Sequence, residues 1–202
     1  MTAVRLILAS SSPRRRELLA SLGLAYEVQK PDVDETQHAG EAPLDYVQRL
    51  SRLKAEAVAA RMAGEVAVLA ADTIVILAAD TIGIDAAGEI LGKPATPDEA
   101  RQMLRRLRSR DHRVCTAFTL LRSGSAPQEI TEIVCSLVTM RDYSDVEIDA
   151  YIATGDPFDK AGSYAIQHPA FAPVAQVQGS YSNVVGLPID EVRTALARFG
   201  LL

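Results

Sequence analysis

The chain has 202 residues, of which 48% are hydrophobic and 23% charged, a composition that is typical of a globular protein and excludes a disordered one. The 21 Lys and Arg residues against 26 Asp and Glu residues give a net charge of −5, which argues against a broad basic face for nucleic acid. At this length the chain can bury enough surface to fold as one domain, or as two small lobes that share a core, without disulfides or metals.

The first predicted elements are a strand, a serine-rich loop and a helix. Residues 4–9 form a short apolar run with β-branched members, which the serines at 10–12 end. Ser12 suits the N-cap of a helix, Pro13 suits its first position, and Gly23 suits its C-terminal stop. A strand is therefore expected to lead through a serine loop directly into a helix.

The middle of the chain predicts a helix, a buried hairpin and a second helix. Apolar residues recur at helical spacing over 43–62. Residues 66–77 are interpreted as one buried strand interrupted at 72–73, and a β-hairpin that ends at 92–94 is expected to follow. A capping box with proline in the first turn, at 96–99, predicts the next helix.

The second half predicts an antiparallel pair of strands and two further helices. The β-rich runs at 114–121 and 130–140 are separated by a Ser-Gly-Ser turn. A capping box at 144–147 begins a helix that Gly155 ends, and the last helix runs from 188 to 200. Because strands and helices are mixed without strict alternation, we expect an α/β fold with a mixed sheet.

The sequence also indicates where the protein acts. The longest stretch without charged residues, 161–189, is too polar to span a bilayer. The apolar run in the first residues is too short for what we expect of a signal peptide. Two cysteines, Cys115 and Cys135, lack the clustered Cys or His neighbours of a zinc site. We expect a reducing, cytoplasmic location, with neither a membrane nor nucleic acid as a partner.

The segment Ser-Ser-Ser-Pro-Arg-Arg-Arg at 10–16 is the first candidate site. A helix N-terminus offers free N–H groups and a partial positive charge, to which arginines add forked donors suited to phosphate. Basic residues in a first turn oppose the helix dipole unless an anion binds there. A capped surface helix with solvated arginines is the alternative. We favour phosphate binding by Ser10, Ser12, Arg14 and Arg15, in a loop that lacks the glycine-rich pattern of a Walker motif.

Asp72 is the second candidate, because a carboxylate in an apolar strand requires a partner. Bound Mg²⁺, a lysine or a structural salt bridge would each satisfy it. The same Ala-Asp-Thr-Ile tetrad recurs at Asp80, but turn residues follow it closely, so that copy is the weaker candidate. Lys54 lies inside the apolar stripe of its predicted helix, and its stem is expected to reach the surface unless a phosphate or Asp72 is near.

The segment 156–167 concentrates hydrogen-bonding side chains between turn residues. Asp159 and Lys160 are expected to contact a substrate. Gln167 can read the edge of a nucleobase, since an amide supplies both a donor and an acceptor. Its alternative role is a hydrogen bond to the backbone of its own loop.

Taken in order, these segments resemble the Maf family of nucleoside triphosphate pyrophosphatases, once named for an effect on septum formation. The resemblance covers nearly the whole chain, so a single domain is expected over 1–202. It implies the elongated α/β fold of inosine triphosphate pyrophosphatases, with the substrate in a cleft between two lobes and with homodimer formation. The matching segments include Leu-Ala-Ser-Ser-Ser-Pro-Arg-Arg at 8–15, Val-Asp-Glu at 33–35, Ala-Asp-Thr-Ile-Val at 71–75, Gly-Lys-Pro at 92–94, Asp-Lys-Ala-Gly at 159–162 and Gly-Leu-Pro at 186–188.

The resemblance implies hydrolysis of a nucleoside triphosphate to the monophosphate and pyrophosphate with Mg²⁺ or Mn²⁺, which clears noncanonical or surplus nucleotides. It makes Asp72 the catalytic carboxylate that accepts a proton from the attacking water. Lys54 and Lys93 would steady the triphosphate, and Glu35 would hold the metal together with Asp72. A nucleotide-binding regulator of cell division that does not hydrolyse its ligand is the rival interpretation.

The resemblance also indicates the substrate. Arg14, Thr73 and Gln167 fall at positions that separate the family's branches, and they look like the branch that acts on dTTP and UTP. Two departures accompany this match: a longer hairpin between 76 and 89, and 168–173 in place of a glycine-rich turn. The second departure lies beside Gln167 and therefore bears on base preference.

Overall fold

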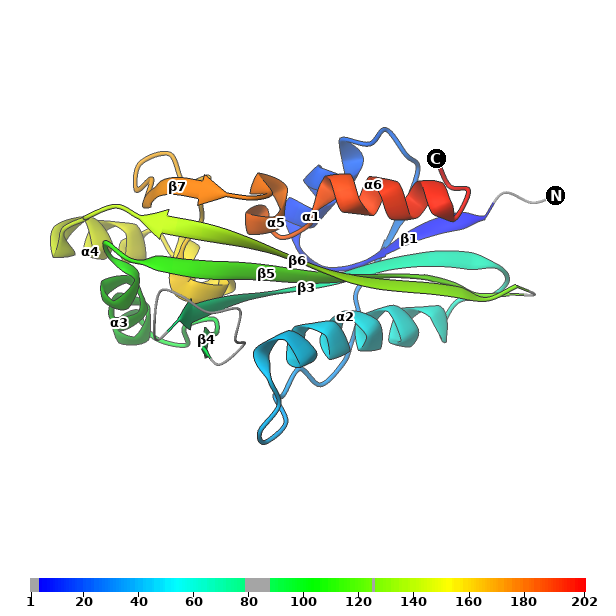
Figure 1. The fold of residues 1–202 in the computed structure, drawn as a ribbon, viewed down its shortest axis with the longest axis horizontal. Coiled ribbons are helices and arrows are strands. Elements are labelled where there is room, and N and C mark those ends of the chain that lie inside the picture. Colours follow the sequence, from blue (N-terminus) through cyan, green and yellow to red (C-terminus); the bar gives the residue numbers. More distant parts are fainter. Residues whose placement is uncertain (1–3, 79–87, 125) are drawn as a thin grey trace.

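The computed structural model describes residues 4–78, 88–124 and 126–202 (Figure 1). Its strands are β1 (Arg5–Ala9), β2 (Glu27–Gln29), β3 (Val66–Ala78), β4 (Gly88–Leu91), β5 (Asp111–Arg122), β6 (Gln128–Met140) and β7 (Val174–Gln178). Its helices are α1 (Pro13–Ala20), α2 (Pro43–Ala59), α3 (Pro97–Leu107), α4 (Asp145–Ala153), α5 (Tyr181–Val185) and α6 (Ile189–Arg198). Two short 3-10 turns, η1 (Asp156–Asp159) and η2 (Ala161–Ser163), follow α4.

The seven strands form one mixed sheet, as the sequence predicted. Its order is β2-β1-β3-β5-β6-β7, with β4 also paired to β3. The strand β1 is parallel to β2 and β3, and every other pairing is antiparallel. On one edge of β3, the pairing with β1 stops at Ala70 and the pairing with β4 begins at Val75. Residues 71–74 of that edge therefore have no strand beside them within the described parts of the chain.

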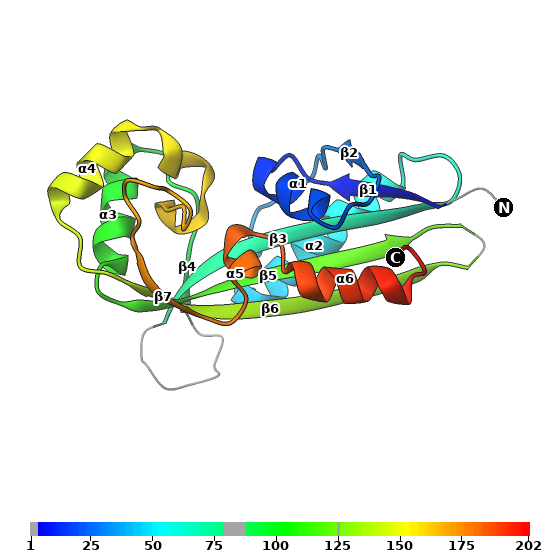
Figure 2. The ribbon, with the colours of Figure 1, turned by 90° about the horizontal axis from the view of Figure 1, so that it is seen from above.

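Two lobes share the long strands β3, β5 and β6 (Figures 1 and 2). In the first lobe, α2 covers one face of the sheet, while α1 and α6 cover the other. The second lobe holds β4, α3, α4, η1 and η2. Each lobe has its own core; the largest fully buried side chains include Leu8, Leu69 and Phe118 in the first lobe and Leu104, Tyr143 and Tyr151 in the second.

Most predicted elements are confirmed, and so are the caps at Ser12 and Ser144. The predicted capping box at 96–99 is half formed: Thr96 Oγ1 accepts from the Glu99 amide, but the Glu99 carboxylate accepts from the Ala95 amide and not from that of Thr96. Ser12 Oγ accepts a hydrogen bond from the Arg15 amide, and Ser144 forms the expected capping box with Glu147. One prediction is wrong: the strand is not interrupted at 72–73, because β5 pairs with β3 through these positions and satisfies their backbone groups. The second Ala-Asp-Thr-Ile copy at Asp80 and the connection between β3 and β4 lie outside the described residues.

Two features bear on the expected location. Cys115 and Cys135 face each other across β5 and β6 and form a disulfide, with their Cα atoms 4.1 Å apart. Such bonds are rare in reducing compartments, and none was expected from the sequence. The reducing, cytoplasmic location stays a prediction. Within the described ranges, no helix combines the length and the apolar character that crossing a bilayer requires.

His112 lies buried in the second lobe, where it is 1% exposed. Its Nε2 lies 2.7 Å from Tyr164 Oη, and its Nδ1 has no hydrogen-bond partner among the described atoms. Burial lowers the pKa of His112 to about 4. The folded protein therefore holds this ring neutral over a range in which the unfolded chain takes up a proton.

We expect His112 to make the protein less stable in weak acid. Because its pKa is about 4 when folded and about 6.5 when unfolded, its contribution to the free energy of unfolding is complete above pH 6.5 and falls as the pH drops toward 4. Between pH 7 and pH 4.5 the loss amounts to about 2 kcal/mol. Urea unfolding of the wild type and of His112→Gln at both pH values measures this loss in the free energy of unfolding. An equal loss in the two proteins contradicts this assignment.

Candidate active site

A cleft of about 530 Å³ lies between the two lobes. Its walls come from the loop after β1, the unpaired stretch of β3, the segment after β4, the η1–η2 region and α5. The carboxyl end of β1 and the N-terminus of α1 meet there, which is where α/β folds with parallel strands bind anionic ligands. Every residue predicted from the sequence to act in catalysis, substrate binding or metal binding lines this cleft.

The serine loop shapes the first wall. Ser10 is 3% exposed, and its Oγ accepts a hydrogen bond from the Ser12 amide at 3.1 Å. Ser12 Oγ accepts one from the Arg15 amide at 3.4 Å, which caps α1. The loop is thus fixed by its own side chains, and it places the positive end of α1 at the cleft.

The three arginines of α1 have different surroundings. Arg15 donates from Nε to the Gly186 carbonyl oxygen at 2.8 Å and from Nη2 to Thr73 Oγ1 at 3.0 Å. Arg14 Nη1 lies 3.5 Å from Asp159 Oδ2, so this ion pair joins the two lobes. Arg16 is exposed and does not line the cleft. Two of the three arginines are therefore available to a ligand.

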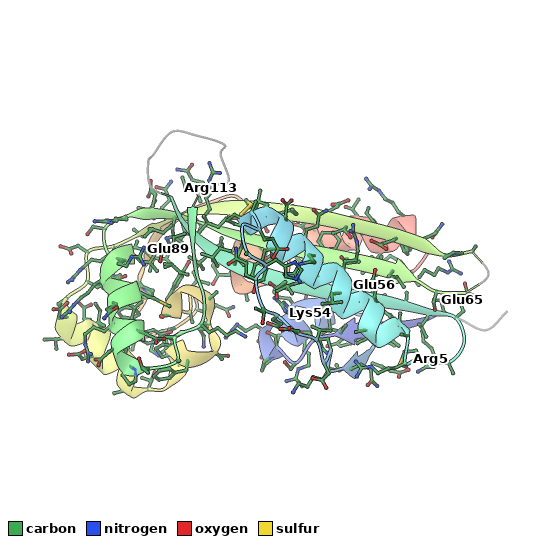
Figure 3. All side chains as sticks on the ribbon, turned by 90° about the horizontal axis from the view of Figure 1, so that it is seen from below. Arg5, Lys54, Glu56, Glu65, Glu89 and Arg113 are labelled. Atoms are coloured by element: carbon green, nitrogen blue, oxygen red, sulfur yellow. A yellow bond between two sulfur atoms is a disulfide. The ribbon has the colours of Figure 1, made fainter. Side chains whose placement is uncertain are left out.

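Lys54 and Asp72 form the centre of the site. Lys54, which lies on α2 (Figure 3), is 5% exposed and lines the cleft. Its Nζ lies 2.6 Å from Asp72 Oδ1 and 2.9 Å from Glu35 Oε1. The partner that Asp72 requires is therefore a lysine, and the stem of Lys54 does not extend to the surface. Successive residues of a strand face opposite sides, so Asp72 faces α2 whereas Thr73 faces Arg15.

Glu35 belongs to the loop before α2, and Tyr46 Oη holds this loop by donating to the Glu35 carbonyl oxygen at 2.8 Å. Burial acts to raise the pKa of Glu35, but the hydrogen bond and charge of Lys54, together with the charges of Lys93 and Arg15, outweigh burial, so the pKa is lowered. Glu35 is therefore a carboxylate at neutral pH, next to that of Asp72.

Asp72 and Glu35 together fit a divalent cation. Carboxylate oxygens are hard ligands of the kind that Mg²⁺ and Mn²⁺ prefer, and Mg²⁺ is typically held by one or two carboxylates together with substrate phosphates. The described residues contain no group of three His, Cys, Asp or Glu side chains placed to hold a metal. A cation held by these two carboxylates would need its other ligands from a bound phosphate or from water.

The remaining predicted residues lie on the second lobe. Lys93 is exposed in the cleft after β4. Lys160 donates from Nζ to the Asp156 carbonyl oxygen, to Asp156 Oδ1 and to Asp159 Oδ1. These acceptors use all three ammonium hydrogens, so Lys160 positions Asp159 and has no donor left for a substrate. Gln167 is exposed and makes no hydrogen bond to the described residues, so its amide does not bind its own loop.

Sequence reasoning missed the contribution of α5. The turn after this helix supplies the Gly186 carbonyl oxygen to Arg15, and Gly186 has a φ of 126°, a backbone conformation that favours glycine. The signal was the Gly-Leu-Pro segment at 186–188, which belonged to the family resemblance but received no role.

Comparison with known proteins identifies the family of this chain. The model of the Maf-like protein family matches residues 5–199. A dTTP/UTP pyrophosphatase of Anaeromyxobacter dehalogenans strain 2CP-1 is 49% identical over 201 residues, which cover 98% of this chain and 95% of the relative. A dTTP/UTP pyrophosphatase of Geotalea uraniireducens strain Rf4 is 48% identical over 197 residues, which cover 98% and 96%.

Two solved structures are also similar. One is a nucleoside-triphosphatase, dITP/XTP pyrophosphatase, from Mycobacterium abscessus, with a TM-score of 0.45 and 12% identity over 98% of both chains. The other is a HAM1 protein from Coxiella burnetii, with a TM-score of 0.46 and 18% identity over 97% of this chain and 100% of that chain.

Proposed function

The chain belongs to the Maf-like protein family, and from this premise we propose that it hydrolyses dTTP, UTP and related pyrimidine nucleotides to the monophosphate and pyrophosphate. One observation carries the proposal: a buried carboxylate, Asp72, lines the same cleft as residues 10–15, the serine-arginine loop, which suits a triphosphate. The relatives' names supply the substrates. Removal of noncanonical or surplus nucleotides is the role that we propose for this reaction.

The phosphates bind where positive charge faces the cleft. Arg15 uses two of its five N–H donors within the protein, so the others remain for phosphate oxygens. Arg14, Lys93 and the N-terminus of α1 add further positive charge at the cleft. A protein with a net charge of −5 can thus bind a polyanion, since the local field of the site is positive.

In the chemical step, a water oxygen attacks the α-phosphorus and the bond between that phosphorus and the bridging oxygen breaks. Lys54 occupies Asp72 Oδ1, so Oδ2 is the oxygen that accepts the water proton. The third hydrogen of Lys54 is available to a phosphate oxygen, because Asp72 and Glu35 take the other two. Pyrophosphate is the leaving group, and Arg14 and Arg15 bind its oxygens as it departs. A divalent cation held by Asp72 and Glu35 would neutralise further charge on the phosphates.

The nucleobase of the substrate lies toward the second lobe. The unbonded amide of Gln167 presents a donor and an acceptor, which match the alternating carbonyl and N–H groups of uracil and thymine. Beside it, the unusual segment at 168–173 forms a tight turn in which His168 Nδ1 accepts from the Phe171 amide at 3.0 Å. This turn stands in place of the glycine-rich one expected from the resemblance and follows Gln167 directly in the chain.

We expect a panel of nucleoside triphosphates to yield pyrophosphate as the first product, with dTTP and UTP turned over fastest. The assay uses purified protein with Mg²⁺ or Mn²⁺ and separates pyrophosphate from orthophosphate. Orthophosphate as the first product contradicts the proposal. The rival, a regulator that binds without hydrolysis, predicts binding of the same nucleotides with no product.

A further inference from the structure

A ring of hydrogen bonds connects three residues that line the cleft, Arg15, Thr73 and Gly186, with two buried residues behind them, Thr116 and Asn183. Thr116 on β5 is fully buried and does not line the cleft. Its Oγ1 lies 2.9 Å from Thr73 Oγ1 and donates to the Asn183 carbonyl oxygen at 3.1 Å. The same carbonyl accepts from the Gly186 amide at 3.0 Å. Since Gly186 accepts from Arg15 in turn, the ring closes on Arg15.

The direction of every bond in this ring follows from donor chemistry. The Asn183 carbonyl only accepts, so the single hydrogen of the Thr116 hydroxyl is used there. Thr116 therefore accepts from Thr73, and the hydroxyl hydrogen of Thr73 points away from the cleft. This leaves a lone pair of Thr73 Oγ1 directed at Arg15 Nη2.

The acceptor end of the ring is itself fixed. Asn183 is fully buried, and its Nδ2 donates to the Val114 carbonyl oxygen and to Ser136 Oγ, each at 2.9 Å. These bonds attach α5 to β5 and β6. The orientation of the Arg15 guanidinium thus depends on a rigid part of the sheet, through the hydroxyl of Thr116.

We propose that Thr116 is a positioning residue, which fixes the Thr73 hydroxyl as an acceptor and thereby aims the free donors of Arg15 at the substrate phosphates. This inference deepens the proposed function and rests on it, because it requires a phosphate in the cleft. Thr116 contacts no substrate itself.

The test compares Thr116→Val, which keeps the shape but removes the hydroxyl, with Thr116→Ser, which keeps the hydroxyl. For Thr116→Val we expect the KM for UTP and the Kd for inorganic pyrophosphate to rise about ten-fold, the size of one hydrogen bond to a charged group, with kcat within about two-fold. Thr116→Ser should keep wild-type values. A merely structural role would instead reduce the folded fraction, which lowers the apparent kcat and leaves KM unchanged.

Thr119→Val is the matched control. Thr119 is also a fully buried threonine of β5, but its hydroxyl bonds to Ser51 and Thr131, each at 2.9 Å. Both kinetic constants should stay at wild-type values in this variant. In an Arg15→Met background, Thr116→Val should change the Kd for pyrophosphate no further, since Thr116 acts only through Arg15.

The outcomes separate the two proposals. If the wild type binds pyrophosphate but hydrolyses no nucleotide, the proposed function fails, and the Kd values of the variants still decide the role of Thr116. Wild-type Kd and KM in Thr116→Val overturn that role, as does an equal effect in the Arg15→Met background. If Thr116→Val does not fold, Thr116→Ala takes its place with the same expected result.

Discussion

Asp72→Asn should lower kcat for UTP by about 10²–10⁴-fold, the usual contribution of a general base. The amide cannot accept the proton of the attacking water, while the shape of the side chain is unchanged. Binding should survive, because Arg14, Arg15 and Lys93, which the substitution leaves unchanged, still supply positive charge for the phosphates. Steady-state kinetics measures kcat, and calorimetry measures the Kd for UTP. We expect the Kd of the variant to be no larger than the KM of the wild type.

The control for this substitution is Asp45→Asn, which changes an exposed carboxylate in the first turn of α2. It should leave kcat within about two-fold of wild type, as is usual for surface substitutions. An Asp72→Asn protein that remains folded and hydrolyses UTP at the wild-type rate contradicts the assigned role of Asp72.

Lys54→Met should lose both activity and stability. The Lys54 side chain is 6% exposed and that of Asp72 is 12% exposed, so removal of the ammonium leaves a nearly buried carboxylate without its partner. Breaking a buried pair in this way costs about 3–5 kcal/mol, which we expect to appear in urea unfolding at pH 7. Activity should fall as well, because Lys54 orients Asp72 and offers its third hydrogen to a phosphate.

The double variant Lys54→Met with Asp72→Asn separates the loss of stability from the loss of activity. It removes both charges, so most of the lost stability should return, while hydrolysis should remain absent. If the double variant is as unstable as Lys54→Met alone, the instability comes from lost packing and not from an unpaired carboxylate.

The sequence predicted the parts of the site that depend on local chemistry. Ser12 and Pro13 predicted the start of α1. The arginines that follow oppose the helix dipole at that position, which indicated that an anion binds there. Asp72 required a partner because it lies in an apolar strand. The sequence did not identify this partner, because Lys54 contacts Asp72 only when α2 packs across the sheet.

The parts that were missed have weak local signals. The helix α5 and the strand β7 are too short to show periodicity, and the Gly186 oxygen that holds Arg15 is a backbone atom, which no side-chain pattern reveals. The disulfide had a signal that was not used: Cys115 and Cys135 are equally far from position 125 in the predicted turn, which places them opposite each other in the hairpin.

Hydrolysis of UTP in ¹⁸O-labelled water tests most directly whether the site brings water to the α-phosphorus. The label should appear in UMP, with none in pyrophosphate, when both products are analysed by mass spectrometry. Label in pyrophosphate would place the attack on the β-phosphorus and contradict the arrangement of Asp72 and the serine-arginine loop described above.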